Sequence, residues 1–433
     1  MLKFLLSAEG IISGLLPLTI LMLAGAYFTF KTRGVQFRRF FGAIKFSLCI
    51  KKDKKGGVSS FGAVCNSLAA TVGTGNIAGV AAAITIGGAG SVFWMWVSAF
   101  VGMAVKAAEI TIAVYFRKKG GKEYFGGPMY YIKEEAGNGA LAVIFSAACI
   151  FSAFATGNIT QINACVSAME TGTVARVVMG IIFTVTVFVI IMGGAKKITR
   201  FTTAVLPVMA ALYIILCLGV IIKNISLLDN AFLAIFKGAF APKAVTGGAV
   251  GSFYITLITG AQKGIFSNEA GLGTAGLAHA AADDADVKTQ GLFGVFEVFV
   301  DTLLICTLTA LTILCSGVII NYGKTASSEL VAEALKTVYG SLSAPLLTLM
   351  LSLFAVSSVI GWAAYGITAG KFLFPRNGKR LFCLIYPLFC LAGAVMNVSL
   401  AFRLAEFFNG IMLIINVFAV LYLRKTAVSV LKE

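Results

Sequence analysis

The sequence of 433 residues is 59% hydrophobic and only 12% charged, and its mean hydropathy is +0.93. This composition excludes a soluble protein, because apolar runs near the ~20 residues of a membrane-spanning helix recur from end to end. The formal charge of +17 comes from basic residues between these runs, where they set membrane topology, so nucleic-acid binding is not expected. The nine cysteines form no CxxC pair and there is a single histidine, which argues against a metal centre or a disulfide framework.

The first apolar run, within residues 1–30, predicts a retained membrane helix rather than a cleaved signal peptide. Basic residues follow the run, from Lys31 to Lys55, whereas Lys3 alone precedes it. Positive charge on this side predicts an N-terminus outside the membrane. Residues 34–50 mix phenylalanines with these charges, which indicates an amphipathic helix at the membrane surface.

Ten further spans are predicted, so that the chain crosses the membrane eleven times and ends inside the cell. We expect these spans at residues 60–87, 90–116, 141–167, 174–194, 201–222, 249–279, 289–320, 345–372, 380–400 and 402–424. Most of the 35 Lys and Arg fall in loops that this topology places inside. Residues 224–246 and 324–342 are predicted to form surface helices over an outer vestibule.

Without the first helix, the ten spans divide into two sets of five, and each set begins with an interrupted span. Because five is odd, the two sets enter the membrane from opposite sides, as an inverted repeat requires. We therefore predict an all-α polytopic membrane protein with a 5+5 inverted repeat and two discontinuous helices. Its expected parts are a peripheral N-terminal helix and basic segment (1–56), a first repeat (57–223), an outer-loop helix with the second repeat (224–424) and a cytoplasmic tail (425–433).

The first interruption is the sequence TVGTGN at residues 71–76, inside an otherwise apolar run. Backbone groups freed at such a break must be buried in protein or line a cavity. Amides from Gly73 to Asn76 at a helix start suit a carboxylate, and Thr74 or Asn76 adds a side-chain donor. Freed carbonyls from Ala69 to Val72 suit a small hard cation such as Na⁺. The alternative is close helix packing, for which GxG is common in membrane spans.

The second interruption, KGIFSNEAGLGTAG at residues 263–276, lies about half a chain later and contains Ser267 and Glu269. A pair of broken spans in corresponding halves points to a transporter's binding site. Glu269 is costly in lipid and is expected to face protein or water. It either neutralises Lys263, holds a gate, or binds a proton or cation.

Uncharged polar residues near mid-membrane extend the predicted site. Asn158 and Gln161 are three apart, on one face of a helix, and their amides suit both ends of an amino acid. Ser357 and Ser358 supply hydroxyl groups, and Trp362, which follows them, supplies one large apolar wall of the site. The alternative for all of these is interhelical hydrogen bonding.

Several ionisable residues inside spans are assigned to helix packing or gating rather than to acid–base chemistry, because no nucleophile or metal cluster accompanies them. They are Lys106, Glu109, Glu297, Asp301 and Glu406. His279, at an inner helix end, is expected to be structural. An enzyme is therefore not predicted.

These motifs resemble those of the alanine/glycine:cation symporter family, which adopts the leucine-transporter fold. The resemblance covers nearly the whole chain and is carried by ATVGTGNIAG with FWMWV downstream, GGPMYYI, GIFSNEAGLGTA with AHAAA, Asp301-Thr302 and Gly361-Trp362. It implies Na⁺-driven uptake of small neutral amino acids such as alanine and glycine. Carried over by motif, the residues lining or walling the substrate site are Thr71, Gly75, Asn76, Gln161, Phe266 and Trp362.

By analogy within that fold, a Na⁺ site uses the carbonyls of Ala69 and Val72 with the hydroxyls of Ser357 and Ser358. The chain departs from the family pattern in Ala363-Ala364 after Trp362 and in Lys263, where arginine is usual, so a strict alanine and glycine preference is not implied. We expect no organic cofactor and no obligate protein partner, and a location in the cell membrane. The alternatives are H⁺ coupling through Glu269 or Glu297, and an ion channel.

Overall fold

The computed structural model describes residues 14–48, 57–121, 123–169, 172–248, 252–323 and 328–432. The predictions made for Lys3 and for the basic residues from Lys51 to Lys55 lie outside these ranges. Within them the chain is almost entirely helical, and the one sheet described is a hairpin of β1 (Lys118–Gly120) and β2 (Glu123–Phe125), antiparallel, with Lys118 opposite Phe125. The predicted all-α membrane class is confirmed.

The elements of the first half begin with the predicted peripheral segment and the first broken span. They are α2 (Leu15–Lys31), α3 (Val35–Arg38), α4 (Phe40–Leu48), α5 (Ser60–Thr71), η1 (Gly75–Gly79), α6 (Val80–Gly87), α7 (Ser91–Tyr115), α8 (Pro128–Glu134), α9 (Gly139–Phe154), η2 (Ala155–Ile159), α10 (Thr160–Ser167), α11 (Thr173–Ile191) and α12 (Gly194–Lys223).

The elements of the second half begin with the predicted outer loop. They are η3 (Ile225–Leu227), α13 (Leu228–Phe240), α14 (Pro242–Thr246), α15 (Phe253–Asn268), α16 (Thr274–Ala280), α17 (Val287–Val298), η4 (Phe299–Cys306), α18 (Thr307–Cys315), α19 (Ser328–Tyr339), η5 (Gly340–Leu342), α20 (Ser343–Leu373), α21 (Gly378–Ile385), α22 (Leu388–Val395), α23 (Val398–Tyr422) and α24 (Arg424–Lys432).

Eight helical segments within the described residues are long and apolar enough to cross a membrane, and the bent pair of α5 with η1 and α6 makes up to nine. The eight are Ser91–Tyr115, Gly139–Ser167, Thr173–Ile191, Gly194–Lys223, Val287–Cys315, Ser328–Leu373, Gly378–Val395 and Leu400–Tyr422. The α2 and α15 helices, at 17 and 16 residues, are shorter than that test requires. The count of eleven spans therefore stays a prediction, as does the repeat.

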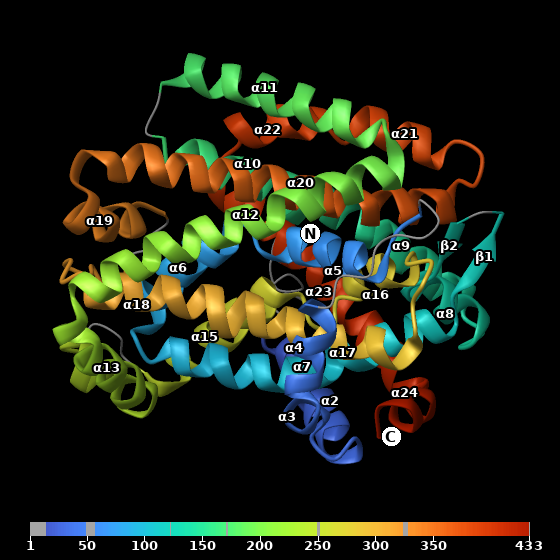
Figure 1. Ribbon diagram of the computed structural model, residues 1–433, viewed down its shortest axis with the longest axis horizontal. Coiled ribbons are helices and arrows are strands. Elements are labelled where there is room, and N and C mark those ends of the chain that lie inside the picture. Colours follow the sequence, from blue (N-terminus) through green and yellow to red (C-terminus); the bar gives the residue numbers. More distant parts are fainter. Residues whose placement is uncertain are drawn as a thin grey trace, which may run out of the picture.

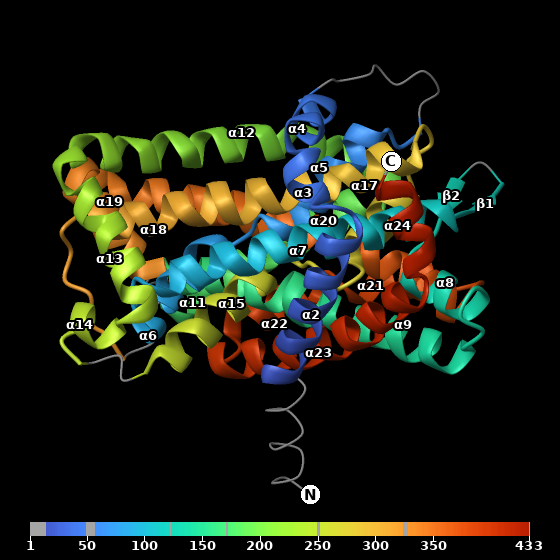
Figure 2. The same ribbon diagram turned by 90° about the horizontal axis from the view of Figure 1, so that it is seen from below.

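The long helices run broadly along one direction, and shorter elements cover the two ends (Figure 1 and Figure 2). The α13 and α19 helices, from the two predicted outer loops, lie at the same end in both views, and the β1–β2 hairpin and α8 lie at the opposite end. Both outer loops therefore contain helices, as predicted, and they gather on one side of the molecule.

The α7 helix is the most buried of the eight spans and packs closely against α15. Glycines make this approach possible. A Cβ added at Gly260 would lie 2.1 Å from the carbonyl oxygen of Ser91, and one added at Gly264 would lie 2.4 Å from Ser98 Oγ. Small residues at such positions allow helix backbones to approach in a membrane. This packing fixes α15, and hence the second break at its end, against the core.

Both predicted discontinuous helices are present. The first span bends by 51° between α5 and the helix that begins at Gly75. The second is interrupted between α15 and α16, where Glu269, Gly271 and Gly273 adopt left-handed backbone conformations with φ of 56°, 82° and 84°. Glycine adopts this region without steric cost, whereas a residue with a Cβ does so at a cost in free energy. Glu269 is therefore held in a strained conformation.

Candidate functional site

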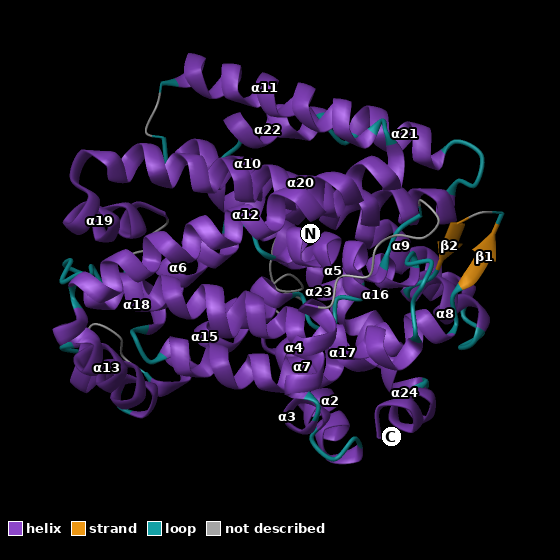
Figure 3. Ribbon diagram, in the orientation of Figure 1, coloured by secondary structure: helices purple, strands orange, loops and turns teal. Residues whose placement is uncertain are grey.

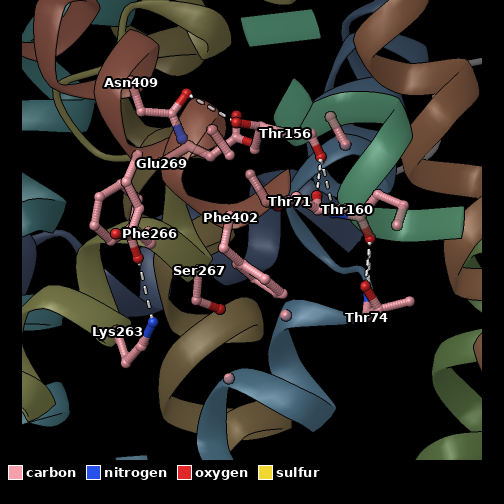
Figure 4. A pocket seen from close by; sticks show the side chains of 16 residues that line it. Thr71, Thr74, Thr156, Thr160, Lys263, Phe266, Ser267, Glu269, Phe402 and Asn409 are labelled. Carbon is pink, nitrogen blue, oxygen red and sulfur yellow. Dashed lines mark hydrogen bonds and ion pairs between the residues drawn. The ribbon is translucent and has the colours of Figure 1, made fainter. Parts of the chain in front are cut away.

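A cavity of about 90 Å³ lies where the two breaks meet (Figure 4). The hydroxyls of Thr71, Thr74 and Thr160 lie on one side of it, and Lys263 and Phe266 lie on the opposite side. The complete lining consists of Ala70, Thr71, Thr74, Gly75, Gly79, Thr156, Thr160, Gln161, Lys263, Phe266, Ser267, Glu269, Phe402, Ala405, Glu406 and Asn409. The structure thus brings together most of the predicted substrate residues.

Side chains replace the helical hydrogen bonds at the first break. The amide of Gly73 donates to Asn76 Oδ1 at 2.8 Å, and the amide and hydroxyl of Thr74 donate to Gln161 Oε1 at 3.0 and 2.8 Å. In a continuous α-helix these two amides would bond the carbonyls of Ala69 and Ala70. The break therefore releases helix carbonyls next to the pocket, as predicted from the glycines.

Asp301 joins the two breaks in one buried polar cluster. Its Oδ1 accepts from the Asn76 amide at 2.7 Å, and its Oδ2 accepts from the hydroxyls of Ser267 at 2.7 Å and Thr302 at 2.9 Å. All four residues are buried. Asn76 and Gly73, although predicted to touch substrate, are not part of the pocket lining, and Asn76 holds the break in shape instead. Asp301 thus connects the first span, the second broken span and η4.

Three π-helical turns surround this region, and they are η1, η2 and η4. Such turns are rare and concentrate at functional sites. Two of the predicted site residues, Asn158 and Gln161, bond different neighbours, and only Gln161 lines the pocket. Asn158 donates to the carbonyl of Tyr386 at 2.8 Å, whereas Gln161 faces the first break. Asn158 lies within the π-helical turn at Ala155–Ile159, and Gln161 lies in the α-helix that follows it.

Trp362 also lies outside the pocket lining. It is fully buried and packs on η2, where a Cβ added at Gly157 would lie 2.3 Å from the tryptophan Cβ. Phe266, by contrast, lines the pocket as predicted from the resemblance. The two aromatic residues therefore occupy different places, and only Phe266 borders the cavity in this structure.

One face of α23 borders the pocket and was not predicted to bind substrate. Phe402, Ala405, Glu406 and Asn409 follow the i, i+3, i+4, i+7 spacing of one helical face. Across the pocket, Thr156 donates to Asn409 Oδ1 at 3.2 Å. The signal available in the sequence was the polar pair Glu406 and Asn409 within an apolar run.

The charges at the pocket pair differently from the first expectation. Lys263 Nζ lies 3.5 Å from Glu406 Oε1, and both side chains are partly exposed. Glu269 does not pair with Lys263, and its Oε2 accepts from the Thr274 hydroxyl at 2.7 Å. Of the three roles expected for Glu269, the neutralisation of Lys263 is therefore wrong, because Glu406 on α23 is the carboxylate within ion-pair distance of Lys263.

The residues predicted to hold Na⁺ lie behind the first break. Ser358 Oγ donates to the carbonyl of Ala70 at 3.1 Å, and the buried Ser357 Oγ has no hydrogen-bond partner among the described residues. A buried hydroxyl without a partner, next in sequence to a serine that contacts the end of α5, fits a hard cation that prefers oxygen ligands. The donor set is therefore compatible with Na⁺.

A second buried polar network lies beside the second break. Lys106 Nζ lies 3.2 Å from Glu297 Oε2 and donates to the carbonyl of Asn268, the last residue of α15, at 2.8 Å. Ser67 on α5 also donates to Glu297 Oε2, at 2.7 Å. His279 completes the network at 2.6 Å from Glu297 Oε1. Glu297 thus connects α5 of the first broken span to α16 of the second, which agrees with its predicted structural role.

Known proteins are similar to this chain in sequence and in fold. The sodium:alanine symporter family matches residues 2–433. The sodium/alanine symporter AgcS of Methanococcus maripaludis is 34% identical over 422 residues, covering 95% of this chain and 92% of the relative. The amino-acid carrier protein AlsT of Bacillus subtilis is 35% identical over 419 residues, covering 96% and 88%.

Among solved structures, the crystal structure of MhsT in complex with L-phenylalanine has a TM-score of 0.60 at 12% identity, with 88% of this chain and 99% of that chain covered. MhsT is a transporter of the leucine-transporter fold, and the likeness shows that fold here. With the family match over almost its full length, the chain belongs to the sodium:alanine symporter family.

Proposed function

We propose that this protein couples the inward movement of Na⁺ to the uptake of small neutral amino acids, alanine and glycine foremost. Membership of the symporter family makes it a membrane transporter and not an enzyme. The observation that carries the narrower proposal is the small cavity at the two breaks, lined largely by uncharged groups. An amino acid offers one carboxylate and one ammonium, which such a lining complements.

The size and lining of the cavity support a small substrate. Gly75 and Gly79 both border it, and a Cβ added at either would meet nothing within 4 Å, so substrate atoms approach the backbone directly. The helix that begins at Gly75 directs its positive end toward the pocket, which favours the substrate carboxylate. Phe266 gives a short apolar side chain a surface to pack on.

The charge balance of the core supports a coupling cation. Among the described residues, four carboxylates are buried, those of Glu109, Glu269, Glu297 and Asp301. Lys106 is the single buried lysine among the same residues, and the described arginines are not buried. An excess of buried carboxylates favours the entry of a cation. We assign Na⁺ to the carbonyls of Ala69 and Val72 with the hydroxyls of Ser357 and Ser358.

A larger cavity of about 780 Å³ supports an alternating-access cycle. Its lining includes Asn66 on α5 and Ala278 on α16, the two half-helices that we place on the inner side of the membrane. Four basic residues also line it: Lys196, Lys371, Arg376 and Lys379. Basic residues mark the cytoplasmic side. We propose this cavity as the exit route and place the N-terminus outside. The membrane potential adds ~2.3 kcal/mol per Na⁺ per 100 mV.

The proposal is tested by uptake of radiolabelled alanine and glycine into proteoliposomes. We expect uptake to require external Na⁺ and to rise when the interior is made negative. Uptake that persists unchanged when choline or Li⁺ replaces Na⁺ would contradict Na⁺ coupling. An inward H⁺ gradient that drives uptake without Na⁺ would instead favour the second candidate, H⁺ coupling through Glu269, the buried carboxylate that borders the pocket.

A further inference from the structure

The one histidine of the chain lies in a closed hydrogen-bonding arrangement away from the pocket. His279 on α16 is fully buried, its Nε2 lies 2.6 Å from Glu297 Oε1, and its Nδ1 lies 2.7 Å from Gln290 Nε2. Both partners are on α17 and are themselves fully buried. With the Gln290 amide in this orientation its nitrogen donates to Nδ1 and Nε2–H donates to Glu297, which is the hydrogen-bond pattern of a neutral imidazole.

The Gln290 side chain can serve a second protonation state without loss of a hydrogen bond. Its Oε1 is buried and has no partner among the described residues. Rotating the amide by half a turn brings Oε1 to the position opposite Nδ1 and leaves the amide nitrogen unpartnered instead. An imidazolium would then donate from Nδ1 to Gln290 and from Nε2 to Glu297. Each state leaves one amide atom unpartnered, so the two states keep the same number of hydrogen bonds.

Acidic and basic groups surround the pair of His279 and Glu297. Glu297 on α17 and Glu109 on α7 face this region, and Lys106 is the one ammonium among these buried groups, three residues before Glu109. The other titratable groups near Glu297 are neutral in their ordinary forms, the thiol of Cys65 on α5 and the hydroxyl of Tyr365 on α20. From the neighbouring hairpin, Glu123 is paired with Lys371 at the surface. Glu297 is thus the carboxylate that both Lys106 and His279 contact.

We propose that His279, with Gln290 as its switchable partner and Glu297 as its counter-ion, is a reversible proton-binding site, separate from the amino-acid pocket and from the proposed Na⁺ ligands. The ligand is a single proton. Binding converts the bond from Nε2 to Glu297 into a charge-assisted one, which is stronger than its neutral form.

The site has a consequence for transport that rests on the proposed function. Glu297 accepts from Ser67 on α5 as well as from His279 on α16, so it ties the inner halves of both broken spans to α17. A stronger bond to His279 holds these half-helices together. Proton binding therefore slows the opening of the inner side, and acid slows uptake.

Because the chain has one histidine, nitrogen-15 labelling of histidine gives a direct reading of this site. The labelled protein, purified through a tag free of histidine, is followed by NMR in lipid nanodiscs from about pH 5 to about pH 8, the range in which histidine changes charge. We expect the Nε2–H tautomer at the alkaline end and reversible conversion to the imidazolium at the acid end. A spectrum that stays unchanged over this range, or a neutral Nδ1–H tautomer, would overturn the proposal.

The Gln290→Met variant separates this site from an ordinary buried histidine. Methionine keeps the length of the side chain but offers Nδ1–H no oxygen, so protonation is expected to shift to lower pH by about one unit or more. Gln262→Met, on α15 and outside the network, is the matched control and leaves the titration unchanged. An equal titration in Gln290→Met and in the parent protein would contradict the proposed partner.

Uptake measured against internal pH tests the consequence for transport. The parent protein is expected to slow by at least about threefold at the acid end of the titrated range, and His279→Gln, which stays neutral, is expected to show a flat profile. An unchanged pH dependence in His279→Gln would overturn the link to transport. The NMR titration does not depend on transport, so failure of the proposed function would appear separately, as absent uptake at every pH.

Discussion

The two helix breaks that meet at the pocket are stabilised by side chains of different chemistry. At the first, neutral side chains bond the freed backbone, since Asn76 and Gln161 accept hydrogen bonds from the amides of Gly73 and Thr74. The second carries charge, with Glu269 in a left-handed conformation and Lys106 bonded to the carbonyl at the end of α15. This difference suggests a division of labour, in which the neutral break shapes the substrate site and the charged break connects it to cations and to the inner half-helices.

The largest effect is expected from removing the Asp301 carboxylate, which joins the two breaks. In Asp301→Asn an NH₂ group replaces one of the two carboxylate oxygens, which accept hydrogen bonds from Asn76 and Ser267. The NH₂ group then faces another hydrogen-bond donor. We expect alanine uptake to fall about 100-fold, equal to roughly 2.7 kcal/mol of transition-state stabilisation. Asp229→Asn, on the exposed surface of α13, is the matched control. Near-normal uptake by Asp301→Asn would show that the breaks function without this connection.

Two glycines two residues apart test how closely the first break is packed. A Cβ at Gly73 would lie 2.4 Å from Ser358 Oγ and 2.7 Å from Gln161 Oε1, whereas a Cβ at Gly75 would meet nothing within 4 Å. We expect Gly73→Ala to lose about 30-fold in uptake, since a clash at this distance displaces groups worth about 2 kcal/mol. Gly75→Ala should fold normally and raise the KM for alanine more than that for glycine. The reverse order would contradict the described break.

A third pair of variants separates a residue at the pocket from one behind it. Gln161→Ala removes the acceptor of the Thr74 amide, and we expect the KM for alanine to rise about tenfold, as for the loss of a buried hydrogen bond. Asn158→Ala removes a bond to the Tyr386 carbonyl, so it should lower thermal stability and leave the KM within about twofold. A larger KM effect for Asn158→Ala would restore the substrate role predicted for it.

The smallest effect is expected at the pair of charges on the pocket wall. Lys263 and Glu406 are 3.5 Å apart, with side chains 25% and 33% exposed. Partly exposed ion pairs contribute about 0.2–1 kcal/mol, so Lys263→Met and Glu406→Gln should each change alanine uptake by less than about threefold. A double-mutant cycle on uptake measures their coupling. Coupling well above this range would mean that the pair closes the pocket during transport.

Features that depend on the local sequence were predicted correctly. Glycines and an asparagine inside apolar runs located both breaks, and amphipathic spacing in the two outer loops located α13 and α19. In each case the physical cause lies within a few residues, because backbone freedom and apolar patterning are local properties.

Features that depend on neighbours far along the chain could not be predicted. Lys263 pairs with Glu406 and not with Glu269, because α15 and α23 border the same pocket. The positions of Asn158 and Trp362 depend on the π-helical turn η2, and no residue pattern in that stretch distinguishes it from an ordinary α-helix. The polar face of α23 was visible in the spacing of its residues, but its orientation toward the pocket is set by packing alone.

The most direct test of the account is the equilibrium binding of radiolabelled L-alanine to the purified protein in Na⁺ and in choline. We predict saturable binding in Na⁺, at least about tenfold weaker binding in choline, and loss of binding in Asn76→Ala, since that side chain supports the first break. Equal binding in the two salts, or unchanged binding by Asn76→Ala, would contradict a shared site for amino acid and cation at the two breaks.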